Sequence, residues 1–195
     1  MKIIGITGGV GSGKSKVLSY MEERFQAVIC QTDHVAWDLQ KPGQSCYKQI
    51  VQVFGNDILN EDQTINRAKL GQLVFADANK LQQLNKIMHP AVKSFVLEWI
   101  DQEEQRGTTY FVIESALLLE DNYQEFCHEL WYIHADVDIR KQRLKENRQY
   151  DDEKIISIMS TQLSEEDFRV NCQVVIDNSR DFEHTRQQIE QIMKN

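Results

Sequence analysis

Residues 8–15 read Gly-Gly-Val-Gly-Ser-Gly-Lys-Ser and match the pattern G-x-x-x-x-G-K-[ST] of a phosphate-binding loop. An apolar run over 2–7 precedes the loop and predicts a strand, and apolar residues at helical spacing follow from Lys14 onward. Glycines leave the loop's backbone N–H groups open to an anion, and the following helix directs its positive end at the same point. The alternative is a glycine-rich turn that only happens to precede a helix, and the strand-to-helix context favours the phosphate loop.

The residue types in this loop predict the chemistry that it can support. Lys14 can reach the β and γ phosphates of a nucleotide, which makes it a catalytic candidate, and the hydroxyl of Ser15 can bind Mg²⁺. We therefore expect ATP as a substrate and Mg²⁺ as the cofactor. The expected ATP-binding residues of the loop are Gly11, Ser12, Gly13, Lys14, Ser15 and Lys16.

Composition limits the classes of protein to which the chain can belong. The 195 residues are 41% apolar and 27% charged, as in an ordinary globular protein with one sizeable core. A net charge of −8 argues against broad binding to nucleic acid, so we expect no nucleic-acid partner. No apolar run approaches the ~20 residues that cross a bilayer, and the sequence opens with no charged-then-apolar leader. We expect no membrane partner, a cytoplasmic location and a monomer.

Residue types that often form special sites are scattered. The cysteines lack C-x-x-C spacing, so we expect small buried or half-buried thiols rather than a zinc site or a redox pair. The histidines lack H-E-x-x-H spacing, so no histidine metal site is expected. The tryptophans Trp37, Trp99 and Trp131 are expected to be packing residues.

Alternating strand and helix patterns predict an α/β fold. The expected strands cover 2–7, 27–31, 110–114, 130–135 and 174–177, and helical patterns lie between them, including those near 138–146, 153–163 and 182–193. This alternation is typical of a parallel sheet wrapped by helices. The predicted fold is a P-loop NTPase fold with a five-stranded parallel sheet, a helical acceptor-binding insertion and an arginine-bearing lid.

A single domain over 1–195 is expected, because no linker or low-complexity segment divides the chain. Its core would comprise 1–44 and 90–195, and the strand-poor stretch 45–89 would be the helical insertion. Pro90 suits the first turn of a further helix, which Gly107 would end. The lid is expected over about 138–152.

Asp33 is the candidate general base, because it follows the second expected strand and can lie at the carboxyl end of the sheet. We expect that strand to neighbour the strand before the phosphate loop, which would bring Asp33 close to a γ-phosphate and an incoming hydroxyl. The alternative is that Asp33 only caps a helix that begins near His34.

Glu114 ends the third expected strand and resembles the acid that holds Mg²⁺ directly or through water, although Asp is the usual residue there. It could instead bind the acceptor or cap a helix. His89, before Pro90, could contact substrate or be a histidine satisfied within the helical stretch.

Positive charge gathers on one helical segment of this otherwise acidic chain, at Arg140, Lys141, Arg143, Lys145 and Arg148. Such a run is often a solvated helix face. Because this one follows the fourth strand, it could also bring guanidinium groups to a phosphoryl transition state. Arg143 and Arg148 are the catalytic candidates.

The combination of these features resembles the dephospho-coenzyme A kinase family over nearly the whole length. The segments that carry the resemblance are Ile4 to Ser15, Thr32-Asp33-His34-Val35-Ala36, Phe54-Gly55 with Ile58-Leu59, Asn66-Arg67, His89-Pro90, Glu114 to Glu120, the arginine-bearing lid, Gln162 and Ile176-Asp177-Asn178. The resemblance implies transfer of the γ-phosphoryl group of ATP to the ribose 3′-hydroxyl of dephospho-coenzyme A, in the last step of coenzyme A synthesis.

The same resemblance implies roles for individual residues. Asp33 would be the base, Arg143 and Arg148 would lie near the phosphates, Arg67 would belong to the acceptor-binding insertion and Asn178 would lie near adenine. The sequence departs from the family's pattern at Gln31, where an Asp is common, and at Ala116 and Leu119. It also has one extra residue between the two lid arginines.

Two other functions remain open at this point. A nucleoside or nucleotide monophosphate kinase would use the same loop on another acceptor. A regulatory GTPase would need a guanine-reading Asn-Lys-x-Asp, and Asn85-Lys86-Ile87-Met88 lacks the Asp.

Overall fold

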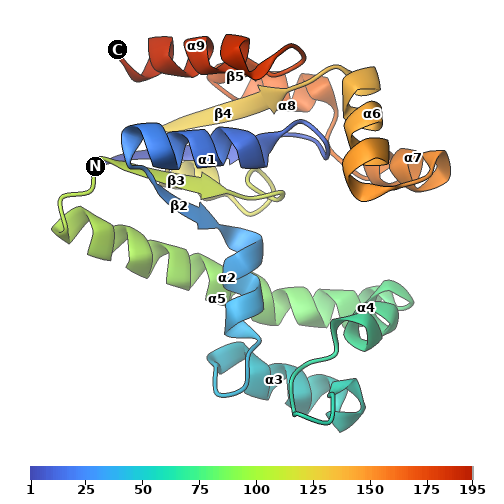
Figure 1. Cartoon of the computed structure of the whole chain (residues 1–195). Coiled ribbons are helices and arrows are strands. Elements are labelled where there is room, and N and C mark those ends of the chain that lie inside the picture. The colour runs from blue at the N-terminus through green and yellow to red at the C-terminus, as the bar shows by residue number, and fades with distance from the viewer. Residues whose placement is uncertain (195) are drawn as a thin grey trace. The chain divides into compact units, whose positions relative to one another are not determined.

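One five-stranded sheet, in the order β2-β3-β1-β4-β5, organises the computed structural model, which describes residues 1–194 (Figure 1). β1 pairs in parallel with β3 and β4, and β4 pairs in parallel with β5. The strands are β1 (Lys2–Thr7), β2 (Val28–Gln31), β3 (Tyr110–Glu114), β4 (Glu129–His134) and β5 (Val174–Asp177). The predicted α/β fold with five strands is confirmed.

The strand order corrects one expectation. β3, rather than β2, is the neighbour of β1, so the strand before Asp33 is separated from the phosphate-loop strand by one strand. β2 lies at the edge and has four residues, of which only Cys30 is fully buried, whereas Phe111, Val112 and Ile113 of β3 are all buried. The more continuous apolar strand takes the more central position, where both faces are covered.

By its contacts, the chain forms two compact units. The first comprises Met1–Ile29 and the chain from Gly107 onward, and the second comprises Cys30–Arg106. The prediction that 45–89 is an acceptor-binding insertion stays a prediction; the second compact unit extends beyond that stretch at both ends.

The first unit holds its helices against the sheet by apolar side chains. Ile4, Ile6, Trp131 and Ile133 of the sheet share a buried cluster with Val17, Leu18 and Met21 of the helix after the loop. This helix is α1 (Lys14–Phe25), and the later helical segments are η2 (Tyr123–Glu125), α6 (Val137–Arg148), α7 (Asp152–Ser160), α8 (Glu165–Asn171) and α9 (Phe182–Met193).

The second unit is helical after the end of β2. Its segments are α2 (Thr32–Leu39), α3 (Ser45–Phe54), η1 (Asn56–Ile58), α4 (Arg67–Phe75) and α5 (Ala78–Gln105). The expectation that Pro90 begins a helix is wrong, because α5 continues through it. Proline removes one backbone donor and crowds the preceding turn. The buried residues Met88, Val92, Val96 and Ile100 still form one stripe across that position, and this packing keeps the helix in one piece.

The prediction about the cysteines is confirmed within this fold. Cys30, Cys46 and Cys172 are buried free thiols and Cys127 is half-buried, as expected. No helix within residues 1–194 combines the length and the apolar character needed to cross a bilayer.

Candidate phosphate-binding site

The glycine-rich loop joins the carboxyl end of β1 to the amino end of α1, as the motif predicts. Gly13 is the N-cap of α1 and has a left-handed backbone with φ of 89°, and no side chain caps the helix there. A Cβ atom at Gly13 would lie 2.3 Å from Nδ2 of Asn178, so glycine is required for both conformation and space. The uncapped helix end is therefore available to an anion.

Ser12, within this loop, carries a buried hydroxyl that lacks a hydrogen-bond partner in the described part of the chain. Its side chain is almost completely buried, with 1% of its surface exposed. An unsatisfied buried hydroxyl costs about 1–3 kcal/mol. A bound polar group at the loop would relieve this cost, which fits a loop built around a phosphate.

Lys14 lies between two oxygen groups. Its Nζ atom donates a hydrogen bond to the Gly8 carbonyl oxygen at 2.7 Å and lies 3.7 Å from Oε1 of Glu114. Glu114 ends β3 and stands in register with Ile6, two residues before the loop. The structure thus brings these two predicted site residues together, with both side chains mostly buried.

Asn178 supports the loop from the far end of the sheet. It follows β5 and is 3% exposed, and its Nδ2 atom donates to the Ser12 carbonyl oxygen at 2.7 Å. Its Oδ1 atom accepts a hydrogen bond from Oγ1 of Thr185 at 2.8 Å. Both polar atoms of the side chain are therefore engaged with the protein, and the expected role of Asn178 near adenine stays a prediction.

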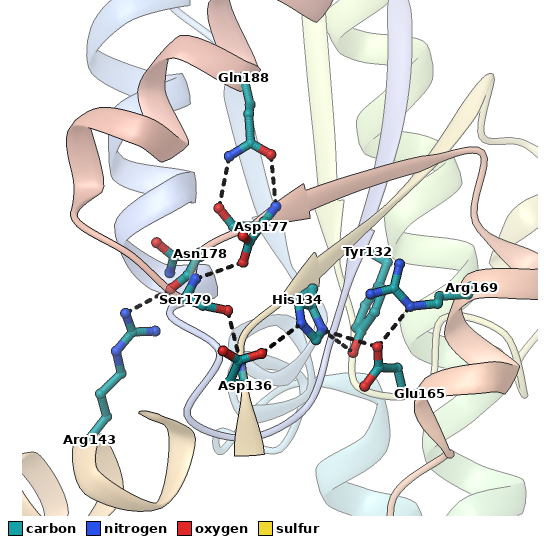
Figure 2. A network of polar contacts seen from close by, with 10 residues as sticks. All are labelled: Tyr132, His134, Asp136, Arg143, Glu165, Arg169, Asp177, Asn178, Ser179 and Gln188. Atoms are coloured by element: carbon teal, nitrogen blue, oxygen red, sulfur yellow. Dashed lines mark hydrogen bonds and ion pairs between the residues drawn. The ribbon is translucent and has the colours of Figure 1, made fainter. Parts of the chain in front are cut away.

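The two lid arginines differ in their surroundings. Arg143 of α6 donates from Nη2 to the Asn178 carbonyl oxygen at 2.8 Å (Figure 2). Its Nη1 atom donates to the Ser12 carbonyl oxygen at 3.3 Å. Arg148 is the last residue of α6 and is exposed. Hydrogen bonds thus hold Arg143 beside the phosphate loop, and a helix face that was only solvated would not make such bonds. Arg148, in contrast, is exposed to solvent.

A polar network stabilises the ends of β4 and β5 next to these groups (Figure 2). His134 at the end of β4 lies 3.4 Å from Asp136 and 3.6 Å from Glu165. A hydrogen bond from Arg169 is the main reason why the pKa of the Glu165 carboxyl lies below its ordinary value. The His134 carbonyl oxygen accepts a hydrogen bond from the Asn178 N–H at 2.8 Å, which links this network to the loop.

Asp177 belongs to the same network. Its carbonyl oxygen and N–H are held by the side-chain amide of Gln188, and its carboxylate accepts the Ser179 N–H at 2.9 Å (Figure 2). Burial alone would raise the pKa of Asp177, but the hydrogen bonds from Ser179 and the nearby His134 and His184 outweigh it and lower that pKa. The turn that leads into Asn178 is therefore fixed from several sides.

Asp33, Arg67 and His89 belong to the second unit. Asp33 is exposed in the first turn of α2, whose N-cap is Gln31, so the alternative that Asp33 is the helix N-cap is wrong. Arg67 is exposed at the start of α4, and its guanidinium lies 4.4 Å from the centre of the Trp37 ring. His89 is half-buried on α5.

The tryptophans Trp37 and Trp131 differ in their surroundings. Trp131 is completely buried, as predicted, whereas Trp37 is 43% exposed. The Trp37 ring contacts Arg67 and lies 5.0 Å from the ring of His34. Trp37 therefore packs against polar side chains at the surface and not in the core.

Sequence reasoning left two residues at the loop without a role. Arg140 and Gln162 both bind the backbone of Val10, although neither was assigned to the site. Arg140 belongs to the basic run and Gln162 is one of the residues that carry the family resemblance. Both could therefore have been considered as site residues from the sequence. Lys16, in contrast, places its side chain over the Phe182 ring, with Nζ 4.3 Å from the ring centre.

Few of the described residues at this site could act as ligands of a divalent cation. Ser15 is exposed in the first turn of α1, and no group of three or more His, Cys, Asp or Glu residues that could hold a metal occurs between residues 1 and 194. Mg²⁺ in kinases is bound by one or two protein groups together with substrate phosphates and water. The residues present therefore fit Mg²⁺ that arrives with a nucleotide.

Comparisons with known proteins give a matching family model and similar proteins. The family model described as "Dephospho-CoA kinase" matches residues 2–184. The dephospho-CoA kinase of Oceanobacillus iheyensis is 33% identical over 192 residues, which are 98% of this chain and 96% of that protein.

Solved structures share the fold. The structure of TT1252 from Thermus thermophilus has a TM-score of 0.84 and 23% identity, and the match covers 99% of this chain and 96% of that one. The dephospho-CoA kinase from Campylobacter jejuni has a TM-score of 0.73 and 19% identity, with 100% of this chain and 96% of that one covered. At these identities the likeness is evidence of fold alone.

Proposed function

Because the chain belongs to the dephospho-CoA kinase family, we infer that it phosphorylates dephospho-CoA in the final step of coenzyme A synthesis. The observation that carries this inference is the family match across residues 2–184, which includes the phosphate loop and the second unit. A phosphate loop by itself would leave the acceptor open. The family match therefore favours dephospho-CoA over a nucleoside or a nucleoside monophosphate.

ATP is the proposed phosphoryl donor, and the loop is its proposed site. The loop residues Gly11, Ser12 and Gly13 would surround the phosphates, with the N–H groups of Gly11 and Gly13 and the hydroxyl of Ser12 as donors. Lys14 would place its ammonium group on the β and γ phosphates. The buried Ser12 hydroxyl and the uncapped end of α1 support this assignment. Arg143 and Arg148 are proposed to neutralise charge that develops during transfer.

Four side chains are the proposed acceptor groups. Asp33 would accept the proton of the ribose 3′-hydroxyl, and its exposure and its position after β2 support this role. Arg67, His89 and Glu114 are proposed to contact the acceptor. The guanidinium of Arg67 is exposed and rests on Trp37, so it is available to an anionic group of the acceptor.

Mg²⁺ is the proposed cofactor, with Ser15 as its protein ligand and Glu114 as a second candidate. When bound, it would neutralise phosphate charge. A cytoplasmic location and a monomer are also proposed.

An acceptor screen tests the function. Purified protein is incubated with ATP and Mg²⁺, and ADP release is followed with dephospho-CoA, common nucleosides and nucleoside monophosphates as separate acceptors. We expect dephospho-CoA to give the highest kcat/KM. A nucleoside or monophosphate preferred by tenfold or more, about 1.4 kcal/mol, would contradict the inference.

A further inference from the structure

The tip of the phosphate loop is held by two side chains that the function described above does not use. The N–H of Val10 donates to Oε1 of Gln162 at 2.9 Å, and Nε of Arg140 donates to the Val10 carbonyl oxygen at 2.9 Å. Nη2 of Arg140 also donates to the same Oε1 atom of Gln162 at 3.1 Å. Three hydrogen bonds therefore form a closed ring around one loop residue.

These three residues come from distant parts of the chain. Arg140 lies on α6, and Gln162 lies between α7 and α8, so they are 130 and 152 residues away from Val10 in sequence. The ring joins the proposed lid and the segment after it to the loop. It also uses the Val10 N–H, which is then no longer available to a phosphate in this conformation.

The packing around Arg140 shows that the ring is closely fitted. A Cβ atom at Gly9 would lie 2.3 Å from Nη2 of Arg140, and one at Gly11 would lie 2.8 Å from the Arg140 carbonyl oxygen. Glycine at position 9 is thus needed for the close approach of this guanidinium. The loop and Arg140 fit one another without room for a side chain between them.

Arg140 is half-buried, and Glu165 interacts with its charge electrostatically without forming an ion pair with it. No ion pair within 4 Å joins it to any carboxylate of the described residues, and burial lowers the pKa of its guanidinium. Its acceptors are the neutral oxygens of Val10 and Gln162. Desolvating a guanidinium in this way is costly, and hydrogen bonds to the loop offset part of that cost.

We propose that Arg140 and Gln162 are positioning residues for the nucleotide, which fix the loop tip through the Val10 peptide groups and so keep the loop shaped for phosphate before ATP arrives. A loop that is already ordered loses less conformational entropy on binding, so the ring increases ATP affinity without touching ATP. The inference rests on the proposed function only in taking ATP as the ligand of the loop.

The first test compares Gln162→Ala with Gln142→Ala. Gln142 is exposed on α6 and bonds only within that helix, to Glu146, so its loss is a matched control. ATP binding is measured by titration calorimetry far below the melting temperature, and exchange of the Val10 amide hydrogen is followed by NMR. We expect Gln162→Ala to weaken ATP binding by about tenfold, with faster Val10 exchange, and Gln142→Ala to change neither.

The second test uses Arg140→Lys and the double variant with Gln162→Ala. Lysine keeps the positive charge but cannot donate to Val10 and Gln162 in the same fork geometry, so ATP binding should weaken. Because both side chains act through Val10, we expect the double variant to be clearly less impaired than the product of the two single effects.

Several results would overturn the proposal. If both single variants bind ATP as the wild type does and only their melting temperature falls, Arg140 and Gln162 have a purely structural role. Tighter ATP binding would mean that the ring restrains the loop, and fully multiplicative effects would mean that the residues act separately. A wild-type chain that binds ATP but phosphorylates another acceptor would contradict the proposed function and not this inference.

Discussion

The ammonium group of Lys14 lies 3.7 Å from the carboxylate of Glu114, and both side chains are mostly buried. The Gly8 carbonyl oxygen also accepts a hydrogen bond from this ammonium group. The charge that the loop offers to phosphate is therefore paired with groups of the protein itself. An incoming triphosphate must compete with Glu114 for Lys14, and the more strongly charged ligand is expected to prevail.

Lys14→Ala should reduce kcat by at least ~10²-fold, because the point charge on the β and γ phosphates is lost as charge shifts toward the leaving group. The fold should persist, since α1 is held by the buried residues Val17, Leu18 and Met21. Steady-state kinetics and circular dichroism check this prediction. Activity close to that of the wild type, with an unchanged spectrum, would show that the loop is not the phosphate site.

Asp33→Asn should reduce kcat by ~10²- to 10⁴-fold, with the lower end expected if the transition state is loose and needs little proton removal. Because Gln31 and not Asp33 is the N-cap of α2, the melting temperature should hardly move. Single-turnover phosphoryl transfer and thermal unfolding are measured on the same preparation.

Asp38→Asn is the matched control for this variant. Asp38 is exposed on the same helix and pairs with Lys41 at the surface, so its loss should leave turnover unchanged. Near-normal transfer in Asp33→Asn would exclude the catalytic role. A large fall in melting temperature with a proportionate loss of activity would make Asp33 a structural residue.

The arginines Arg143 and Arg148 should respond differently to replacement by lysine. Arg143 bridges two carbonyl oxygens, so Arg143→Lys should weaken ATP binding and lower the melting temperature by a few degrees. Arg148 has no such bonds within the described chain, so Arg148→Lys should lower kcat at an unchanged melting temperature. If both variants behave as the wild type does, the lid hypothesis fails.

Stability should depend on the ionisation of Asp177. The folded-state pKa of this carboxyl lies below its ordinary value of about 3.9. Its stabilising effect is therefore fully present above that value and is lost as the pH falls toward the folded pKa. Asp177→Asn keeps an oxygen that can accept the Ser179 N–H but does not titrate. Urea unfolding between about pH 5 and pH 3 should show a shallower loss of stability for the variant, and an equal slope would contradict this reading.

Much of the first unit could be predicted from the sequence because its strands are buried apolar runs. The bounds of β1, β3 and β5 follow such runs directly, and α9 was predicted with its observed ends. α8 was missed, since Phe168 is its only buried residue and leaves no apolar stripe. A signal was present, because Ser164 and Asp167 form a capping box at its start.

The errors have a common cause in packing between distant segments. Pro90 reads locally as a helix start, but the buried stripe on both sides of it keeps α5 continuous. The loop itself was predictable from its motif, whereas the ring of Val10, Arg140 and Gln162 depends on contacts over more than a hundred residues. The spacing of residues along the chain does not predict such contacts.

The most direct test of the account is the identity of the phosphorylated product. Purified protein is incubated with ATP, Mg²⁺ and dephospho-CoA, and the product is analysed by mass spectrometry and phosphorus NMR, with Lys14→Ala prepared in parallel to exclude a contaminating kinase. The account predicts one added phosphoryl group, as a monoester on the ribose 3′-hydroxyl, formed by the wild type and at least ~10²-fold more slowly by Lys14→Ala. No transfer to dephospho-CoA by protein that phosphorylates a nucleoside, or equal transfer by Lys14→Ala, would contradict it.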